Sequence, residues 1–237
     1  MKIKADLHTH SVASGHAYST LEELTKAARR KGLKMLAVTD HAPAMPDGPH
    51  EYYFYNMRAW PEYLNGVRLL KGVEVDIISA SGKLDLPTVY LAAMDIVIAS
   101  AHITVSPANL SKKKNTEMYL KVIQNPHVDI LGHIENPTLK LDYPAVIKAA
   151  KKYGKLVEIN NASFTVARHG SYNNCLEIMR ILKEENMPVV INSDAHISSS
   201  VGEVGKALPL ALQQGIKKEN ILNLNARRTA EYFGIKL

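Results

Sequence analysis

Histidines and carboxylates stand directly after short apolar runs in this chain. The first run leads into Asp-Leu-His-Thr-His at residues 6–10, and the last leads into Ser-Asp-Ala-His at residues 193–196. Side chains alternate between the two faces of an extended strand, so both imidazoles of a His-x-His pair project to one side. Asp194 and His196 repeat the spacing with a carboxylate. Two donors at this spacing are able to reach one divalent ion.

The same association of an apolar run with polar, ligand-type residues recurs along the chain. Six of the ten histidines (8, 10, 41, 102, 133 and 196) lie within five residues of the end of such a run. A single histidine in this position is more often a hydrogen-bonded loop residue than a metal ligand. A cluster of imidazoles and carboxylates, however, is costly to bury unless cations compensate it. The candidate metal ligands are His8, His10, His16, His41, Glu74, His102, His133, Asp194 and His196.

The donor types limit which ions fit. The only cysteine, Cys175, excludes an intramolecular disulfide framework and a thiolate zinc module. Mixed histidine and carboxylate ligation suits Zn²⁺, Mn²⁺ or Fe²⁺ better than Mg²⁺ or Ca²⁺, which prefer oxygen ligands. Seven histidines and two carboxylates exceed the needs of one tetrahedral ion, and two or three ions fit the count. Three ions against Glu74 and Asp194 leave a positive pocket that suits phosphate and activates water for its hydrolysis.

Buried strands are needed to position these residues. Seven apolar runs have the length and β-branched content of strands in a parallel sheet. They span residues 3–7, 35–39, 69–75, 96–101, 128–131, 156–159 and 189–191. Helical patterns between them indicate right-handed β-α-β crossovers. The carboxyl ends of parallel strands are where α/β barrels and open α/β sheets hold their active sites, so we expect the ligands to meet there.

Capping residues predict where the helices begin and end. Ser19 is expected to cap a helix with Glu22 reaching back to it, and Gly32 is expected to end that helix. Further helices are predicted at about residues 115–124 and 143–153, from 173 to before Pro188, and starting near Gly202 and Asn225. Seven strands alternating with helices predict a closed or nearly closed barrel. A doubly wound open sheet is the alternative.

The composition indicates one domain over residues 1–237, a length that suits an α/β barrel. Hydrophobic residues make up 46% and charged residues 22%, which provides for a core. We expect no membrane partner and a cytoplasmic location, because no apolar stretch has the length of a membrane span or a signal peptide. The net charge of +6 favours an anionic substrate. The basic residues are dispersed and not interleaved with aromatic ones, so a nucleic-acid partner is not expected.

The order of the motifs resembles the PHP (polymerase and histidinol phosphatase) metallohydrolase superfamily. The matching motifs are Asp-Leu-His-Thr-His, Thr-Asp-His, Gly-Val-Glu, Ala-His, Gly-His and Ser-Asp-Ala-His, and they occur in order at the ends of six of the seven runs. Residues 16–21, 56–58, 60–61 and 158–161 are also similar to the small stand-alone YcdX-type phosphatases of that superfamily. The resemblance covers nearly the whole chain. It implies a distorted (β/α)7 TIM-like barrel that hydrolyses small phosphate monoesters through a metal-bridging hydroxide.

The resemblance also implies three metal positions. The first uses His8, His10, Glu74 and Asp194; the second shares Glu74 and adds His102 and His133; the third uses His16, His41 and His196. The implied cofactor is three divalent ions, with Zn²⁺ first and Mn²⁺ or Fe²⁺ as alternatives. Ile134 departs from the pattern, since relatives commonly have proline there, which leaves the path of the loop after His133 open. The oligomeric state is also open, and a homo-oligomer is compatible with the sequence.

Further residues are candidates for catalysis or substrate binding. Asp40 is expected to orient ligands or handle protons rather than to bind metal. Arg58, Arg168 and Ser163 are candidate phosphate clamps, because an arginine is able to hold a phosphate through two hydrogen bonds at once. The aromatic residues 52–55 form either a lid or part of the packing over the barrel mouth.

Three other functions are compatible with parts of this ligand pattern. Amidohydrolase barrels, which cleave C–N bonds, also open with His-x-His, but they usually have a lysine at the end of the fourth strand, where this chain has His102. A PHP-type exonuclease or phosphodiesterase acting on nucleic acid is disfavoured by the dispersed basic residues and by the lack of a polymerase domain. A non-catalytic metal-binding protein is disfavoured by the complete ligand set.

Overall fold

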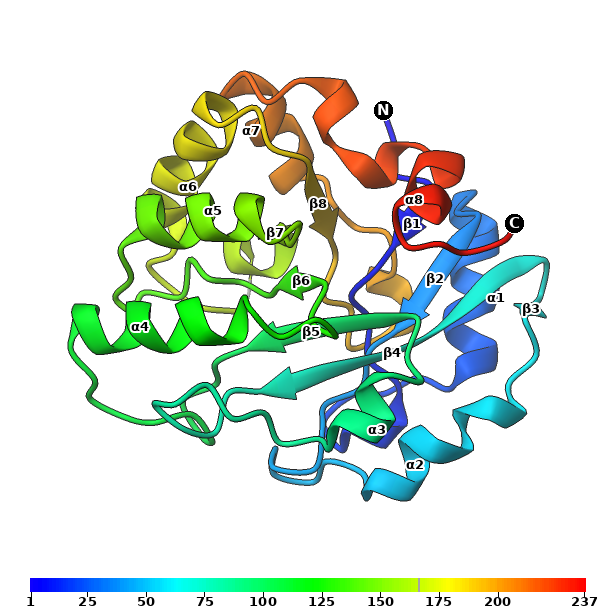
Figure 1. Ribbon diagram of the computed structural model, residues 1–237. Helices are drawn as coiled ribbons and strands as arrows, with labels where there is room; N and C mark the ends of the chain where they lie inside the picture. The colour runs from blue at the N-terminus through cyan, green and yellow to red at the C-terminus, as the bar shows by residue number, and fades with distance from the viewer. Residues whose placement is uncertain (166) are drawn as a thin grey trace.

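Seven parallel strands form a nearly closed barrel in the computed structural model, which describes residues 1–165 and 167–237 (Figure 1). In hydrogen-bonded order they are β1 (Ala5–Asp6), β2 (Met35–Val38), β4 (Val67–Asp76), β5 (Ile96–Ser100), β6 (Ile130–Leu131), β7 (Leu156–Asn160) and β8 (Val189–Asn192). A short strand, β3 (Tyr63–Leu64), pairs antiparallel with β4. Each of the seven predicted runs overlaps one parallel strand, and their ends agree within two residues. The prediction of a distorted (β/α)7 barrel is therefore confirmed over the open sheet.

The barrel closes between β1 and β8 by a few bonds rather than by a continuous ladder. At the carboxyl end, the Asp194 N–H donates to the His8 carbonyl at 3.0 Å, and the His10 N–H donates to the Ala195 carbonyl at 2.8 Å. At the amino end, the side-chain amide of Asn223 donates to a backbone carbonyl on each side of the gap, at 2.9 and 2.7 Å. This closure brings the ligand segments near the two chain ends side by side.

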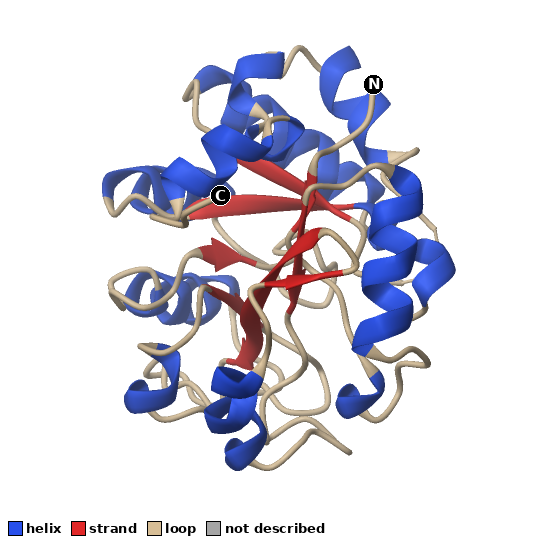
Figure 2. Ribbon diagram, turned by 90° about the vertical axis from the view of Figure 1, so that its right-hand side faces the viewer, coloured by secondary structure: helices blue, strands red, loops and turns tan. Residues whose placement is uncertain are grey.

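Helices cover the outside of the barrel (Figure 2). They are α1 (Leu21–Lys31), α2 (Glu51–Asn56), α3 (Thr88–Leu91), α4 (Lys112–Val122), α5 (Tyr143–Lys152), α6 (Tyr172–Glu184), α7 (Ala207–Gln213) and α8 (Ala226–Tyr232). The helices predicted from the sequence are all present, although α4 starts earlier and α7 later than expected. The short helices α2 and α3 were not predicted.

The cap of α1 differs from the prediction by one residue. Thr20 is the N-cap, and Glu23 reaches back to the Thr20 N–H at 2.8 Å. The predicted pair of Ser19 and Glu22 was wrong because Ser19 is buried and its hydroxyl accepts a bond from the Ser198 N–H at 2.9 Å. Gly32 ends the helix in the left-handed conformation with φ 80°, as predicted.

Two hydrophobic cores hold the barrel together. The larger core lies between the strands and the helices, and the buried Cys175 is part of it. The smaller fills the barrel interior with one face of each strand, such as Ile98 of β5 and Val190 of β8, and Leu222 and Ala230 pack under it at the amino end. The interior is thus apolar up to the level where the ligand residues begin. Within the described part of the chain, every helix is too short or too polar to cross a bilayer.

Candidate metal centre

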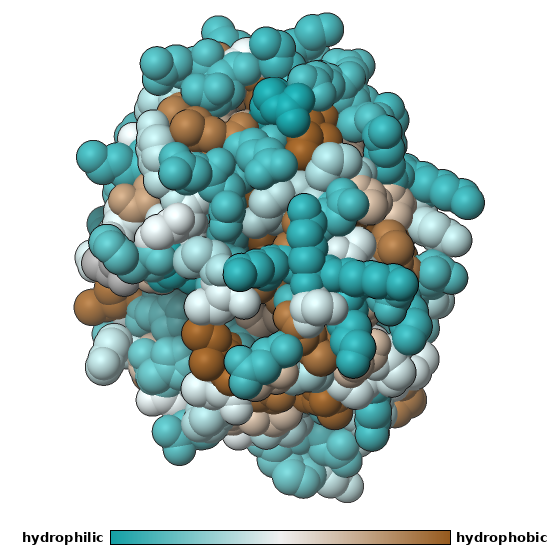
Figure 3. All heavy atoms as spheres, turned by 90° about the vertical axis from the view of Figure 1, so that its left-hand side faces the viewer, coloured by the Kyte–Doolittle hydropathy of each residue, from teal (hydrophilic) through white to brown (hydrophobic). Residues whose placement is uncertain are grey.

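The nine predicted ligands meet at the carboxyl end of the barrel. The strands place them as follows: His8 and His10 after β1, His41 after β2, Glu74 inside β4, His102 after β5, His133 after β6, and Asp194 and His196 after β8. His16 comes from the loop after the short helix η1 (Val12–Ser14). The face toward which β4 and β5 point is covered mainly by hydrophilic side chains, with smaller hydrophobic areas between them (Figure 3).

The Glu74 carboxylate is the centre of the cluster. Its two oxygens face five imidazoles: Oε2 lies 3.4 Å from His8 Nε2, 3.4 Å from His10 Nε2 and 3.0 Å from His41 Nδ1, and Oε1 lies 2.8 Å from His133 Nε2 and 3.6 Å from His102 Nε2. Burial on its own raises the pKa of Glu74, but positive charge on His8, His102 and His41 outweighs it and holds the pKa well below its usual range. Glu74 therefore stays ionised in a buried position.

Asp194 supplies the second carboxylate. Its Oδ1 lies 3.6 Å from His8 Nε2 and 3.4 Å from His10 Nε2. Burial opposes ionisation of Asp194 as well, yet His8, His10 and Arg168 together keep its pKa well below the ordinary value. Both carboxylates are thus anionic acceptors for the same set of nitrogens.

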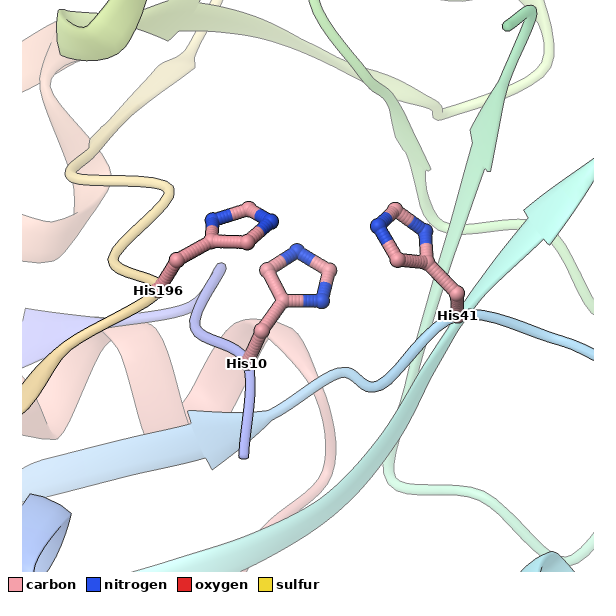
Figure 4. A group of neighbouring side chains, drawn as sticks. All are labelled: His10, His41 and His196. Carbon is pink, nitrogen blue, oxygen red and sulfur yellow. The ribbon is translucent and has the colours of Figure 1, made fainter. Parts of the chain in front are cut away.

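Three histidine rings converge beside these carboxylates. Figure 4 shows His10, His41 and His196, from three separate segments, pointing toward a common space. The ring centroid of His10 lies 4.3 Å from that of His41 and 4.3 Å from that of His196. His16 closes the group, with its centroid 4.9 Å from those of His41 and His196. Such a group of imidazoles has its nitrogens close enough to share an ion.

The buried ring nitrogens show that these residues fit divalent ions. Among the described residues, His8 Nε2, His10 Nε2 and His41 Nδ1 are buried and have no hydrogen-bond partner. A buried polar atom without a partner is costly, and native proteins rarely keep one without a reason. All three face Glu74, so ring nitrogens and carboxylate oxygens surround one region. This is the donor set of Zn²⁺, Mn²⁺ or Fe²⁺.

The spatial groups cut across the expected division among three ions. Donor atoms within 4.8 Å of one another define three groups: His8, His10 and Asp194; His41, Glu74 and His102; and His10, His41 and His196. His10 and His41 each belong to two groups, whereas the family resemblance assigns each of them to one ion. The structure therefore brings the nine residues together, and the share of each ion stays a prediction.

Asp40 lies behind the ligands. It is fully buried and accepts bonds from the Ser11 N–H and hydroxyl, the Ser14 hydroxyl and the Tyr53 hydroxyl, at 2.5 to 2.7 Å. Ser14 in turn accepts from His10 Nδ1 at 3.1 Å. Because its oxygens are used in this way, Asp40 contacts His10 only through Ser14, and its role in orienting ligands stays a prediction.

Arg168 lies in the wall of the cavity above the cluster. The cavity measures about 770 Å³ and is also lined by His16, His102 and Lys206. The Arg168 guanidinium donates from Nε to Ser163 Oγ at 2.7 Å and from Nη2 to Asp194 Oδ2 at 2.8 Å. The Arg168 side chain is nearly buried beside the ligand Asp194, and it has further N–H groups besides these two. Arg168 therefore lies within the site, and Ser163 holds its guanidinium without lining this cavity.

Arg58 lies elsewhere. It lines a separate hollow of aromatic residues, where its guanidinium lies 4.0 Å above the Tyr55 ring and donates to the Tyr55 hydroxyl at 2.6 Å. The aromatic segment 52–55 is divided: Tyr52 and Tyr55 are exposed, whereas Phe54 is buried and Tyr53 bonds to Asp40. The structure does not bring Arg58 together with the ligand cluster.

Two carboxylates behind the ligands were not predicted from the sequence. Asp76 Oδ1 lies 2.8 Å from His102 Nδ1, and Glu158 Oε1 lies 2.8 Å from His8 Nδ1. Both are fully buried. A sequence signal exists for each, since Asp76 stands two residues after Glu74 on the same strand face and Glu158 interrupts an apolar run.

Three residues of the site have backbones in the left-handed region. His133, Arg168 and Asp194 have φ values of 28°, 49° and 56°. Non-glycine residues adopt this region at a cost and keep it where the surroundings hold them. After His133 the chain turns back, with the Asn136 N–H donating to the His133 carbonyl at 3.2 Å and Ile134 buried. This turn is the path of the loop that the sequence left open.

Comparisons with known proteins agree with this geometry. The model of the PHP domain family matches residues 6–169. A protein named "Probable phosphatase" from Thermoanaerobacter sp. (strain X514) is 44% identical over 232 residues, and one of the same name from Acetivibrio thermocellus is 45% identical over 233 residues. Each alignment covers 98% of this chain and 95% of the relative.

A solved structure has the same fold. The histidinol phosphate phosphatase of Lactococcus lactis subsp. lactis Il1403, crystallised with zinc, L-histidinol and phosphate, matches with a TM-score of 0.63. The match covers 90% of this chain and 94% of that one at 17% identity. At this identity the likeness establishes the barrel architecture, and the two relatives above carry the closer relationship.

Proposed function

The chain belongs to the PHP domain family, and from this premise we propose that it hydrolyses small phosphate monoesters at a centre of three divalent metal ions. Relatives that are named phosphatases align over nearly the full chain, which supports a metal-dependent phosphatase. The number of ions, the preference for Zn²⁺ over Mn²⁺ or Fe²⁺, and the substrate class are our proposal.

One observation carries the metal-dependent part of the proposal. Three buried imidazole nitrogens without a partner among the described residues surround the Glu74 carboxylate. Divalent ions held there would polarise the phosphoryl oxygens and activate the attacking water, which is the chemistry that phosphoester hydrolysis requires. His8, His10, His41 and Glu74 would hold these ions together with Asp194 and the other histidines of the cluster.

Arg168 supports the phosphate as the group that is recognised. It is a permanent cation whose planar guanidinium is already fixed at two positions, by Ser163 and Asp194. A fixed guanidinium loses little entropy when its remaining N–H groups bind a phosphate, and hydrogen bonds between charged groups are the stronger kind. Its place in the cavity wall would orient the phosphoryl group toward the ligand cluster and offset the developing negative charge.

The cavity supports a small substrate. At about 770 Å³ it is within the usual range of about 300 to 1,000 Å³ for small-molecule sites. Lys206 lines the same cavity and adds a second cation to its wall. A phosphorylated metabolite fits this space, whereas a nucleic acid strand would require a long basic groove with stacking aromatic residues.

The proposal is tested by screening phosphorylated metabolites and a generic aryl phosphate with Zn²⁺ or Mn²⁺ supplied. Hydrolysis should be lost in His8→Ala and in Glu74→Ala, because each change removes a donor from the centre of the cluster. His127→Ala is the matched control, since His127 lines a hollow at the amino end of the barrel with Asp129. Full activity in His8→Ala or Glu74→Ala would mean that the chemistry lies elsewhere. Faster cleavage of single-stranded oligonucleotides than of any monoester would favour a phosphodiesterase.

A further inference from the structure

Glu158 contacts two predicted ligand residues at once. It lies in β7, fully buried, directly beneath the cluster. Its Oε1 accepts from His8 Nδ1 at 2.8 Å and from the Asn192 side-chain amide at 2.9 Å. Its Oε2 accepts from the His133 backbone N–H at 3.0 Å and from the Asn160 side-chain amide at 3.0 Å. Each oxygen therefore serves one ligand residue and one amide.

The bond from His8 determines which ring nitrogen faces the cluster. A carboxylate only accepts, so the proton of neutral His8 must be on Nδ1. That leaves the lone pair on Nε2, the buried nitrogen that faces Glu74 and Asp194 at 3.4 and 3.6 Å. The hydrogen bond made by one imidazole nitrogen is the usual means of fixing the other as a metal donor.

The bond from His133 supports its backbone. His133 has a φ of 28°, a conformation that a non-glycine residue does not keep without support. Its N–H donates to Glu158 Oε2, and its ring then reaches Glu74 Oε1 at 2.8 Å. The predicted metal positions assign His8 and His133 to different ions, so Glu158 connects two of them.

We propose that Glu158 is a positioning residue that fixes the donor nitrogen of His8 and the backbone of His133 for two adjacent metal positions. This inference rests on the proposed metal centre but not on the identity of the substrate. Both oxygens of Glu158 are used by four protein donors, two of which belong to His8 and His133, and the lining of the cavity is made by other described residues.

Glu158→Gln is the most informative variant. It keeps the shape of the side chain, but one of the two oxygens becomes an NH₂ group, which cannot accept a hydrogen bond. If the new NH₂ group replaces Oε2, it faces the His133 N–H, which cannot become an acceptor. If it replaces Oε1, His8 relieves the conflict by presenting its Nδ1 lone pair, which moves the proton to Nε2. Either arrangement disturbs one ligand residue. Loss of a partner of this kind typically weakens metal binding by about 10- to 100-fold.

The first measurement is zinc binding by titration calorimetry and by elemental analysis, on wild type, Glu158→Gln and Asp129→Asn. Asp129 is the matched control, because it is a half-buried carboxylate at the amino end of the barrel that accepts a bond from the Val97 N–H at 2.8 Å. We expect Glu158→Gln to bind at least one ion about 10- to 100-fold more weakly and Asp129→Asn to match wild type. Equal binding by all three proteins overturns the role of Glu158 and leaves the proposed function standing.

The second measurement does not depend on the folding of a variant. Nitrogen-15 NMR of the zinc-loaded wild-type protein should show His8 with a proton on Nδ1 that is shifted far downfield by the carboxylate. A proton on Nε2 instead overturns the inference. A wild-type protein that binds no zinc, manganese or iron would overturn the proposed function, and the inference with it.

Discussion

Each histidine of the cluster has a role set by the group behind its ring. Glu158, Ser14 and Asp76 accept from Nδ1 of His8, His10 and His102, respectively. In all three rings Nε2 is thereby left for the centre. His41 differs, since its Nδ1 faces Glu74 at 3.0 Å. Histidines of the cluster thus present either Nδ1 or Nε2 to the centre, and the hydrogen-bond acceptor behind each ring decides which nitrogen it is.

Arg168 allows a prediction at the scale of one side chain. Arg168→Lys keeps the charge but loses the planar fork that is held by Ser163 and Asp194. We expect the KM for a phosphate monoester and the Ki for inorganic phosphate to rise by about 10- to 100-fold, since hydrogen bonds to charged groups contribute about 1.5 to 3 kcal/mol. Steady-state kinetics with phosphate as an inhibitor measures both constants.

The metal content of the variant is the control for this prediction. Arg168 also bonds to Asp194, so metal content must stay equal to that of wild type for the kinetic change to report on phosphate. Unchanged inhibition by phosphate at full metal content would remove Arg168 from the substrate site. Arg58→Lys is a useful comparison, because Arg58 lies in the separate aromatic hollow.

The ligand residues could be predicted from the sequence because their signal is local. A histidine or carboxylate directly after an apolar run identifies both its strand and its end, as His102 and His133 show. The supporting carboxylates were missed because their partners are far away in the chain: His8 and Glu158 are 150 residues apart. Arg58 and Arg168 were equivalent in sequence, and only the fold separates them.

At the scale of elements, the end of β6 must approach β5 closely. A Cβ at Gly132 would clash with Ser100 Oγ and would lie 2.8 Å from Ile98 Cγ2. Ser100 has no room to give, because its hydroxyl donates to Glu74 Oε1 at 2.5 Å. The glycine before His133 is therefore required by packing, and it connects the strand contact to the central carboxylate.

Gly132→Ala should consequently both destabilise the protein and reduce its activity. Overpacking of a filled interior costs about 1 to 3 kcal/mol in the free energy of unfolding, and urea denaturation measures this loss. Gly205→Ala is the control for the stability measurement alone, since a Cβ there meets no described atom within 4 Å but Gly205 lines the cavity. Equal stability of the two variants would show that β5 and β6 are not packed as described.

The elements that sequence patterns missed have little apolar periodicity. In α2 the run Tyr-Tyr-Phe-Tyr buries only Phe54, and the helix is started by His50, whose Nδ1 accepts from the Tyr52 N–H at 3.2 Å. The α3 helix has four residues and buries only Leu91. Short helices on loops are decided by tertiary contacts, which a periodic pattern does not contain.

At the scale of the whole molecule, barrel closure is what assembles the centre. The bonds between residues 8–10 and 194–195 join the two ends of the sheet and bring Asp194 against His8 and His10. The apolar interior below supports the cluster from beneath, and the cavity opens above it. One end of the barrel is therefore built for packing and the other for chemistry.

The central claim is that hydrolysis of phosphate monoesters depends on metal bound at this end. The most direct measurement titrates Zn²⁺ or Mn²⁺ into chelator-treated protein and follows aryl phosphate hydrolysis together with bound metal per chain. We predict no hydrolysis without metal, and a rise that levels at about two to three ions per chain, because the cluster has donors for more than one ion. Full hydrolysis by protein with far less than one ion per chain would contradict the account.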